Sequence, residues 1–325
     1  MCTAITYKTK DFYFGRTLDL DFCYHEEVTI TPRKYNLNFK YTQNMPVHYA
    51  MIGMAYVPGD YPLYYDAVNE KGLCIAGLNF VGNACYANEP QEGKINLAQF
   101  EFIPYILGRC ATTDEAEECI KNIHLLKHCY DEMLGVAELH WIIADKQRAI
   151  TVEYMEAGLK IYENKVGVLT NNPPFDVQIF NLNNYMSISP KTPKNLFSTK
   201  LDLQTYSRGM GALGLPGDLS SLSRFVRAAF TKINSAVADT EDKSVNQFFH
   251  ILGSVEQQKG CCIVGDDEYE ITVYTACCNA DKGIYYYTTY ENHSITSVNM
   301  YNVDVEGSNL FRYPLIRWEK ISFQN

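Results

Sequence analysis

The sequence of 325 residues predicts an α+β fold in which strands and helices form layers. Predicted elements come in blocks, in the order strands, helices, strands, helices, strands, whereas a doubly wound fold would alternate them singly. Short turns join several neighbouring strands, which favours mostly antiparallel sheets. No internal repeat or low-complexity linker interrupts the chain, so we expect one domain over residues 1–325.

Short apolar segments in the first third of the chain predict strands. Residues Thr3 to Tyr7 alternate in character from the very start, as in a half-buried strand. Asn69 to Gly72 supply a turn ahead of the last strand in this block. The predicted strands are 3–8, 11–16, 27–32, 49–57 and 73–80.

Two helices and then four strands are predicted in the middle of the chain. Residues 97–110 are apolar on most sides, which indicates a buried helix. Residues 112–126 begin with Thr112 and Glu115 at the spacing of a capping box, which marks the start of a second helix. The strands that follow are 137–145, 148–155, 159–164 and 167–172.

The last third is predicted to combine two helices with a hairpin. Residues 188–218 lack a regular pattern, and a loop of this length in a compact domain is often functional. The helices are expected over 220–237 and 244–255. The hairpin joins strands at 269–278 and 283–290, and a third strand follows at 294–300.

Composition and charge exclude several classes of protein. The net charge of −10 argues against a nucleic-acid partner and against stable association with anionic membranes. No apolar run approaches the ~18 residues of a membrane span, and the N-terminus lacks the pattern of a secretory signal. We therefore expect a cytoplasmic protein whose eleven cysteines are free thiols.

Motifs for cofactors and metals are weak. Gly209, Gly211 and Gly214 match the spacing of a dinucleotide-binding motif, but a proline follows where that motif needs a helix. His124 and His128 lie four residues apart with no further ligand, and no cysteine pair has C-x-x-C spacing. We therefore expect neither a cofactor nor a metal.

The second residue is the strongest candidate for a catalytic group. Initiator methionine is usually removed when a small residue follows, and removal of Met1 would leave Cys2 with a free α-amine and a thiol. An α-amine, with an ordinary pKa of ~7.7–8.0, can take the proton of a thiol, whose ordinary pKa is ~8.5. Base and nucleophile would then belong to one residue.

Such a nucleophile needs a cation, an acceptor for its amine and donors for the oxyanion. A tight turn after the first strand predicts a hairpin that brings Arg16 and Asp19 beside Cys2. From the residues alone, a surface ion pair between Arg16 and Asp19 remains open. Asn79 and Asn171 each end an apolar strand beside turn residues, so each is either an oxyanion donor or a turn former.

Several segments together resemble the choloylglycine hydrolase family of N-terminal nucleophile hydrolases. They run from residue 1 to about residue 290, so the resemblance covers nearly the whole chain. It implies a four-layer αββα sandwich, with two antiparallel sheets between helices. The segments that carry it are MCTAI, FGRTLDLD, NEKGLCIAGLNF, GVLTNNPPFD, GLPGDLSSLSRFVRAAF, FFHILGSVEQQKG and DKGIYYYTTYEN.

The resemblance implies an activity, an assembly and a set of site residues. The activity is hydrolysis of the amide bond in glycine- or taurine-conjugated bile salts, and the assembly is a homotetramer. From the loop sequence YSRGMG itself, Arg208 is a candidate to meet the carboxylate or sulfonate, which would favour taurine, and the preference between glycine and taurine stays open. The implied catalytic residues are Cys2, Arg16, Asp19, Asn79, Asn171 and Arg224, and the implied steroid-binding residues are Leu20, Tyr24, Tyr65 and Met133.

Three alternatives remain open at this point. The first is a penicillin V acylase of the same family, although Asn79 favours bile salts because the acylases often carry tyrosine at that position. The second is a binding protein that keeps the fold without catalysis, which a retained Met1 would mark. The third, a thiol redox sensor, is disfavoured because Cys2 has no obvious resolving cysteine nearby in the sequence.

Overall fold

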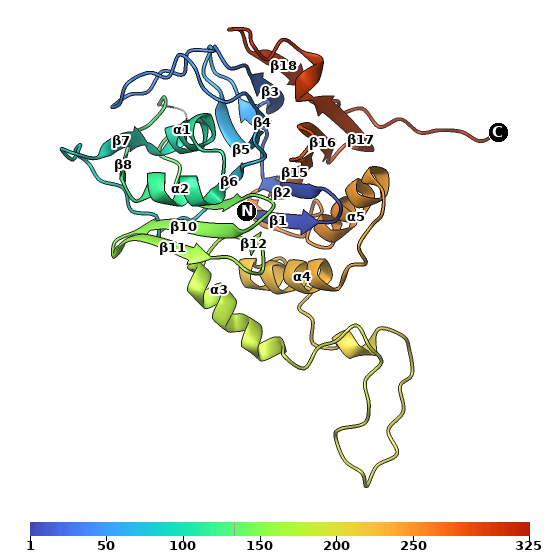
Figure 1. Ribbon diagram of the computed structural model, residues 1–325. Coiled ribbons are helices and arrows are strands. Elements are labelled where there is room, and N and C mark those ends of the chain that lie inside the picture. Colours follow the sequence, from blue (N-terminus) through green and yellow to red (C-terminus); the bar gives the residue numbers. More distant parts are fainter. Residues whose placement is uncertain (133) are drawn as a thin grey trace.

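Two large sheets lie at the centre of the protein, in a computed structural model that describes residues 1–132 and 134–325. Figure 1 shows helices on the outer side of each sheet. Neighbouring strands run antiparallel throughout both sheets. The α+β class and the antiparallel sheets predicted from the sequence are thereby confirmed.

The six-stranded sheet brings the first two strands of the chain beside strands from its last third. Its central pair joins the second strand of the chain to a strand that begins about 250 residues later. The predicted hairpins at both ends of the chain are present. In spatial order the strands are β12 (Val168–Leu169), β1 (Cys2–Lys8), β2 (Phe12–Leu20), β15 (Ile271–Asn279), β16 (Ile284–Thr289) and β17 (Asn292–Asn299).

The eight-stranded sheet is built mainly from the first half of the chain. Two of its strands, β5 and β18, were not predicted, because Asp66 interrupts the apolar pattern of β5 and alternate side chains of β18 are exposed. In spatial order the strands are β11 (Gly158–Glu163), β10 (Ala149–Met155), β9 (Leu139–Ala144), β6 (Cys74–Asn79), β5 (Leu63–Asn69), β4 (Met51–Tyr56), β3 (Glu27–Thr31) and β18 (Phe311–Pro314).

Helices complete the four layers. Helices α4 (Ser221–Asn234) and α5 (Glu241–Gly253) cover the six-stranded sheet, and α1 (Phe102–Arg109) and α2 (Thr113–Ile120) cover the eight-stranded sheet (Figure 1). One apolar cluster fills the space between the sheets and beneath α4 and α5. A second lies beneath α1 and α2. The architecture is therefore the αββα sandwich that the resemblance implies.

The prediction of a single helix over 112–126 is wrong in its second half. Thr112 caps the helix as predicted, since its hydroxyl accepts the Glu115 backbone N–H at 3.2 Å. The helix ends at Ile120, and β8 (Ile123–Leu126) then pairs in parallel with β7 (Ile95–Ala98). The β-branched and leucine side chains of this segment pack better in a strand than the helical pattern suggested.

The remaining elements are short. Helix α3 (Phe175–Asn181) follows a proline-rich turn and was not predicted. The long segment that ends near residue 209 extends away from the layers as a loop (Figure 1). The other elements are η1 (Gln99–Glu101), η2 (Leu182–Tyr185), η3 (Met210–Ala212), η4 (Met300–Asn302), β13 (Ile263–Gly265) and β14 (Glu268–Tyr269).

Two further expectations can be compared with the structure. Among the described residues, none of the helices combines the length and the apolar character that a membrane crossing requires. All eleven cysteines are free thiols, as expected.

Candidate active site

The hairpin of β1 and β2 sets the position of the predicted nucleophile. In its register Cys2 lies opposite Leu18, and Ala4 lies opposite Arg16. Side chains two residues apart on a strand share a face, so Arg16 projects on the same side of the sheet as Cys2. The thiol is buried, with Cys2 only 2% exposed. The predicted hairpin therefore brings cation and thiol together.

The Arg16 guanidinium is aimed at the thiol by three backbone carbonyls. Its Nη2 donates to Cys2 Sγ, while Nη1 donates to Gly77 O at 2.5 Å and Tyr65 O at 3.2 Å. Its Nε donates to Thr17 O at 3.1 Å. These carbonyl acceptors hold the side chain but carry no net charge, so the positive charge remains available to a thiolate.

Arg16 keeps its charge despite complete burial. Burial acts to lower its pKa, but electrostatic interactions, the largest with Cys2 and others with nearby Asp66 and Asp19, raise that pKa above the ordinary value. The carboxylate of Asp66 accepts the hydroxyls of Tyr274 at 2.8 Å and Tyr285 at 2.6 Å. Sequence reasoning missed Asp66, because a single acid within a strand carries no motif.

Asp19 is completely buried and held by two threonine hydroxyls. Thr17 Oγ1 donates to Asp19 Oδ2 at 3.1 Å, and Thr272 Oγ1 donates to Asp19 Oδ1 at 2.7 Å. The guanidinium of Arg224 lies 4.0 Å from Asp19 Oδ2. Burial lowers the pKa of Arg224, and the Asp19 charge acts in the opposite direction. Because Arg16 and Asp19 are both buried, the alternative of a surface ion pair between them is ruled out.

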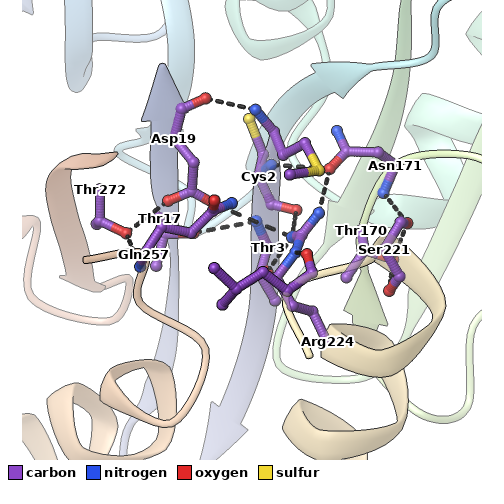
Figure 2. Close-up of polar contacts among 12 residues, drawn as sticks. Cys2, Thr3, Thr17, Asp19, Thr170, Asn171, Ser221, Arg224, Gln257 and Thr272 are labelled. Carbon is purple, nitrogen blue, oxygen red and sulfur yellow. Dashed lines mark hydrogen bonds and ion pairs between the residues drawn. The ribbon is translucent and has the colours of Figure 1, made fainter. Parts of the chain in front are cut away.

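Asn171 connects the nucleophile to the other polar groups (Figure 2). Its Oδ1 accepts from the Cys2 backbone N–H at 2.8 Å and from Arg224 Nη2 at 2.7 Å. Its Nδ2 donates to Asn79 O at 2.9 Å. Arg224 also reaches the first strand, where Nη1 donates to Cys2 O and, at 2.6 Å, to Thr3 Oγ1.

All six predicted catalytic residues thus lie in one place. Cys2, Arg16 and Asp19 come from the first hairpin, and Asn79 ends β6. Asn171 follows β12 and Arg224 lies in the first turns of α4. Five segments from two sheets and one helix therefore converge on the Cys2 thiol.

Met1 precedes the nucleophile in this structure, so the nitrogen of Cys2 is a peptide nitrogen. The Met1 α-amine donates to the Asp19 carbonyl and to the carboxylate of Glu270. Glu270 is 8% exposed and comes from the segment before β15. Sequence reasoning did not identify Glu270 as a neighbour of the amino terminus.

A cavity of about 490 Å³ opens beside the thiol. Cys2, Arg16 and Asn79 line it, together with the predicted steroid-binding residues Leu20, Tyr24 and Tyr65. Sequence reasoning missed most of the rest of the lining, which comes partly from strand ends and η1 and partly from irregular segments. The main missed residues are Tyr56, Leu63, Phe100, Tyr130, Leu134 and Val136.

The other two predicted substrate-binding residues are Met133 and Arg208. Met133 lies outside the described residues, although Leu134 next to it lines the cavity. Arg208 is exposed on the long loop and does not line the cavity of its own chain. The prediction that Arg208 meets the amino-acid end of the substrate therefore has no support within one chain, because that loop extends away from the layers (Figure 1).

The arrangement suits covalent catalysis on an acyl group. A thiol paired with a buried guanidinium is a nucleophile, and nearby amide side chains can stabilise an oxyanion. Among residues 1–132 and 134–325, no cluster of three or more histidine, cysteine or acidic side chains could hold a metal ion. The fold and site together define a hydrolase with a candidate cysteine nucleophile at the second residue.

Comparison with known proteins places the chain in a family. Residues 2–313 match the model of linear amide C–N hydrolases, choloylglycine hydrolase family. A bile salt hydrolase/transferase from Lactiplantibacillus plantarum is 56% identical over 315 residues, covering 97% of each chain. One from Bifidobacterium longum is 38% identical, covering 95% of this chain and 98% of that protein.

A solved structure agrees with this assignment. The C2A mutant of conjugated bile acid hydrolase from Clostridium perfringens superposes with a TM-score of 0.93 at 32% sequence identity, over 100% of both chains. The protein described here belongs to the choloylglycine hydrolase family of linear amide C–N hydrolases.

Proposed function

We propose that this protein hydrolyses the amide bond of glycine- or taurine-conjugated bile salts, with Cys2 as nucleophile after removal of Met1. The contact between Arg16 and the Cys2 thiol, at the wall of the cavity, is the observation that carries the proposal. The relatives named above as bile salt hydrolases support the choice of substrate. The protein needs neither metal nor cofactor for this reaction.

Activation begins at the new amino terminus. The free α-amine of Cys2 takes the thiol proton, and the Arg16 guanidinium stabilises the resulting thiolate. Asn171 Oδ1, which accepts the Cys2 N–H at 2.8 Å, orients the amine for this transfer. Arg224 holds the backbone at Cys2, since its Nη1 donates to Cys2 O, and the carboxylate of Asp19 lies 4.0 Å from the same guanidinium.

The first chemical step forms a thioester. The thiolate attacks the amide carbon, the carbonyl oxygen becomes an oxyanion, and the side chains of Asn79 and Asn171 stabilise it. Collapse of this intermediate breaks the C–N bond, and the leaving nitrogen takes a proton from the Cys2 ammonium. Glycine or taurine then departs with a neutral amino group.

The second step consumes water. The Cys2 amine takes a proton from water as the oxygen attacks the thioester carbon. The C–S bond then breaks, which releases the free bile acid and restores the thiolate. The same oxyanion donors serve both steps, because both pass through a tetrahedral intermediate at the same carbon.

The cavity suits a steroid. Its lining combines aliphatic side chains such as Leu20, Leu63 and Leu134 with the rings of Tyr24 and Tyr130. Aliphatic side chains pack against the fused rings, and tyrosines present an apolar ring with a polar tip to a hydroxylated steroid. Leu20, Tyr24 and Tyr65 are therefore proposed to contact the steroid.

The first experiment measures amino acid released from glycocholate and taurocholate by the purified protein, with Cys2→Ala as control and the absence of Met1 verified by mass. Fast release that depends on Cys2 is expected, and the two rates give the preference between glycine and taurine. Absence of release by the processed protein would overturn the proposal. Cleavage of penicillin V alone would assign the acylase activity instead, against the argument from Asn79.

We further propose that the chain folds as one domain, works in the cytoplasm and forms a homotetramer. Large apolar side chains exposed on the long loop support self-association, since Leu196 is 92% exposed and Phe197 is 82% exposed. Light scattering after size exclusion should give four chains per particle. The Leu196→Asp/Phe197→Asp double variant should shift the particle to a smaller mass.

A further inference from the structure

A buried histidine–glutamate pair lies directly behind the two asparagines of the site. His140 on β9 and Glu153 on β10 are both 0% exposed, and His140 Nδ1 is 3.0 Å from Glu153 Oε1. Strand β9 pairs with β6 so that His140 faces Leu78, the residue before Asn79. The catalytic steps described above do not use this pair.

The imidazole contacts the segments that carry both asparagines. Its Nε2 is 2.8 Å from Thr170 O, and Thr170 directly precedes Asn171. Its ring stacks on Phe80, which directly follows Asn79, with ring centroids 4.3 Å apart and planes 8° from parallel. One side chain thus braces the ends of β6 and β12.

The hydrogen bonds require a proton between the pair. Thr170 O can only accept, so His140 Nε2 carries hydrogen. Glu153 Oε1 also accepts the Phe175 N–H at 3.0 Å. A lone pair on Nδ1 facing a carboxylate would repel it, so one proton lies between Nδ1 and Oε1, whichever group owns it. This fixes the imidazole in one orientation.

The pair is costly to bury, which calls for an explanation. Glu153 Oε2 is buried and has no hydrogen-bond partner among the described residues. Replacing a buried ionisable pair with apolar side chains is often neutral or stabilising, so stability alone does not account for its presence here. Its contacts with both asparagine segments offer a functional account.

We propose that His140 is a positioning residue that sets Asn79 and Asn171 relative to the Cys2 thiol, and that Glu153 fixes the orientation of its ring. This rests on the proposed amide hydrolysis, because Asn171 Oδ1 holds the Cys2 nitrogen and Asn171 Nδ2 holds Asn79 O. Without the imidazole, the ends of β6 and β12 would no longer be held together. Asn79 and Asn171 would then lose their fixed positions around the oxyanion.

Three variants separate the parts of the imidazole. The amide nitrogen of glutamine can replace Nε2 and donate to Thr170 O, whereas the shorter asparagine replaces only Nδ1. Phenylalanine keeps the stacking on Phe80 and loses both hydrogen bonds. We expect His140→Phe and His140→Asn to lower kcat about 10- to 100-fold with KM changed less than about 3-fold, and His140→Gln to restore most of kcat.

Two reactions of Cys2 distinguish loss of oxyanion positioning from damage to the thiol itself. Alkylation of Cys2 by iodoacetamide depends on the thiol and Arg16, so its rate at pH 7 should stay within about 2-fold in all three variants. Acylation of Cys2 by p-nitrophenyl acetate also needs oxyanion stabilisation, so it should fall in parallel with kcat. Met1 removal is verified by mass in every variant.

His48 provides a matched control. It is a buried histidine whose two ring nitrogens lie 2.8 Å from the carbonyl oxygens of Tyr49 and Tyr35. Its Cβ lies beside Gly108, near the end of α1. His48→Phe should lower the melting temperature as His140→Phe does, with kcat and acylation unchanged.

Several outcomes would overturn the positioning role. One is a His140→Phe variant that loses stability but keeps both kcat and ester acylation. Another is equal loss in His140→Gln and His140→Asn. If His140→Phe does not fold because Glu153 is left alone, His140→Phe/Glu153→Leu removes both groups and has the same expected kinetics. If the wild type is acylated by the ester but does not cleave bile salts, the proposed substrate fails, and the acylation rates still decide the role of His140.

Discussion

The two walls of the cavity are built on different principles. The catalytic cluster (Cys2, Arg16, Asp19, Asn79, Asn171 and Arg224) comes from strands, their ends and one helix, and most of its members are buried and hydrogen-bonded to one another. The loop wall (Tyr24, Tyr130, Leu134 and Val136) comes from irregular segments. Chemistry is thus held on the rigid part of the fold, and contact with the substrate body is left to loops.

The two walls also differ in the charge that they carry. The catalytic cluster buries two guanidinium groups, and each lies against a thiol or a carboxylate that balances it. Aromatic contacts organise the loop wall instead, since the ring of Tyr24 packs with its centroid 6.0 Å from that of Tyr56 at the end of β4. Substitutions in the cluster should therefore act on kcat, and substitutions in the loop wall should act on KM.

The largest fall in kcat is expected when the nucleophile is removed. Cys2→Ala removes the only atom proposed to bond to the substrate, so kcat should fall about 10⁴-fold or more. Amino-acid release from taurocholate measures the loss. Cys85→Ala, which changes an exposed cysteine, is the matched control and should keep full activity. Activity of Cys2→Ala within ten-fold of the wild type would refute the assignment.

The next effect concerns the cation beside the thiol. Arg16→Leu removes the donor to Cys2 Sγ and the positive charge beside the attacking sulfur, so kcat should fall about 10²- to 10³-fold. Iodoacetamide should alkylate Cys2 more slowly in the same variant, which reports on the thiolate without any substrate.

Arg227→Leu is the control for that experiment. Arg227 also lies partly buried and donates to the carbonyl oxygens of Ser254 and Pro216, but it belongs to α4 and does not touch the thiol. Its loss should affect stability and leave alkylation unchanged. Equal slowing of alkylation in both variants would show that Arg16 acts through the fold and not through its charge.

Sequence reasoning was most successful where a short distance along the chain decides the geometry. Cys2 and Arg16 meet because one hairpin fixes their register, and a tight turn was enough to predict it. Thr272 reaches Asp19 across 253 residues, and Asp66 meets Tyr285 across 219. Contacts of that kind depend on sheet order, which no local pattern encodes.

The loop wall was the part least accessible from the sequence. Tyr24 could be named only by its rough position in the motifs of the resemblance, and Tyr130 and Leu134 carry no periodic signal. The prediction for Arg208 stays untested, since its loop was recognised as unusual but its direction could not be predicted. Long loops obey no pairing rule that would orient them.

The loop wall gives the third prediction. Tyr24→Ala and Leu134→Ala each remove a side chain that lines the cavity, and loss of this apolar contact should raise KM for conjugated bile salts about 10-fold with kcat within about 3-fold. Steady-state kinetics on glycocholate measures both constants. Tyr206→Ala, an 81% exposed tyrosine on the long loop, should change neither. A fall in kcat without a change in KM would end the division between the two walls.

The smallest expected effect is a change with pH in the stability that depends on Lys232, a buried cation with no role in the reaction. Lys232 lies on α4, the helix that carries Arg224, and its ammonium donates to Val166 O. Burial lowers the pKa of Lys232 to about 8, from an ordinary value of 10.5. Below pH 8 the ammonium is charged in both states, so folding carries the full cost of burying it.

Between the two pKa values the unfolded chain binds more protons, so the stability of the wild type should rise with pH from about 8 upward relative to Lys232→Met. The difference in unfolding free energy between the two proteins should change by about 1–2 kcal/mol between pH 7.5 and 9.5, a range reduced for the partial exposure of the side chain. Urea unfolding at each pH measures it. The lost hydrogen bond to Val166 shifts this difference by a constant and leaves its slope intact. A flat difference would mean that the Lys232 ammonium is as well solvated as a surface lysine, and the contrast with the paired guanidinium groups of the catalytic cluster would then disappear.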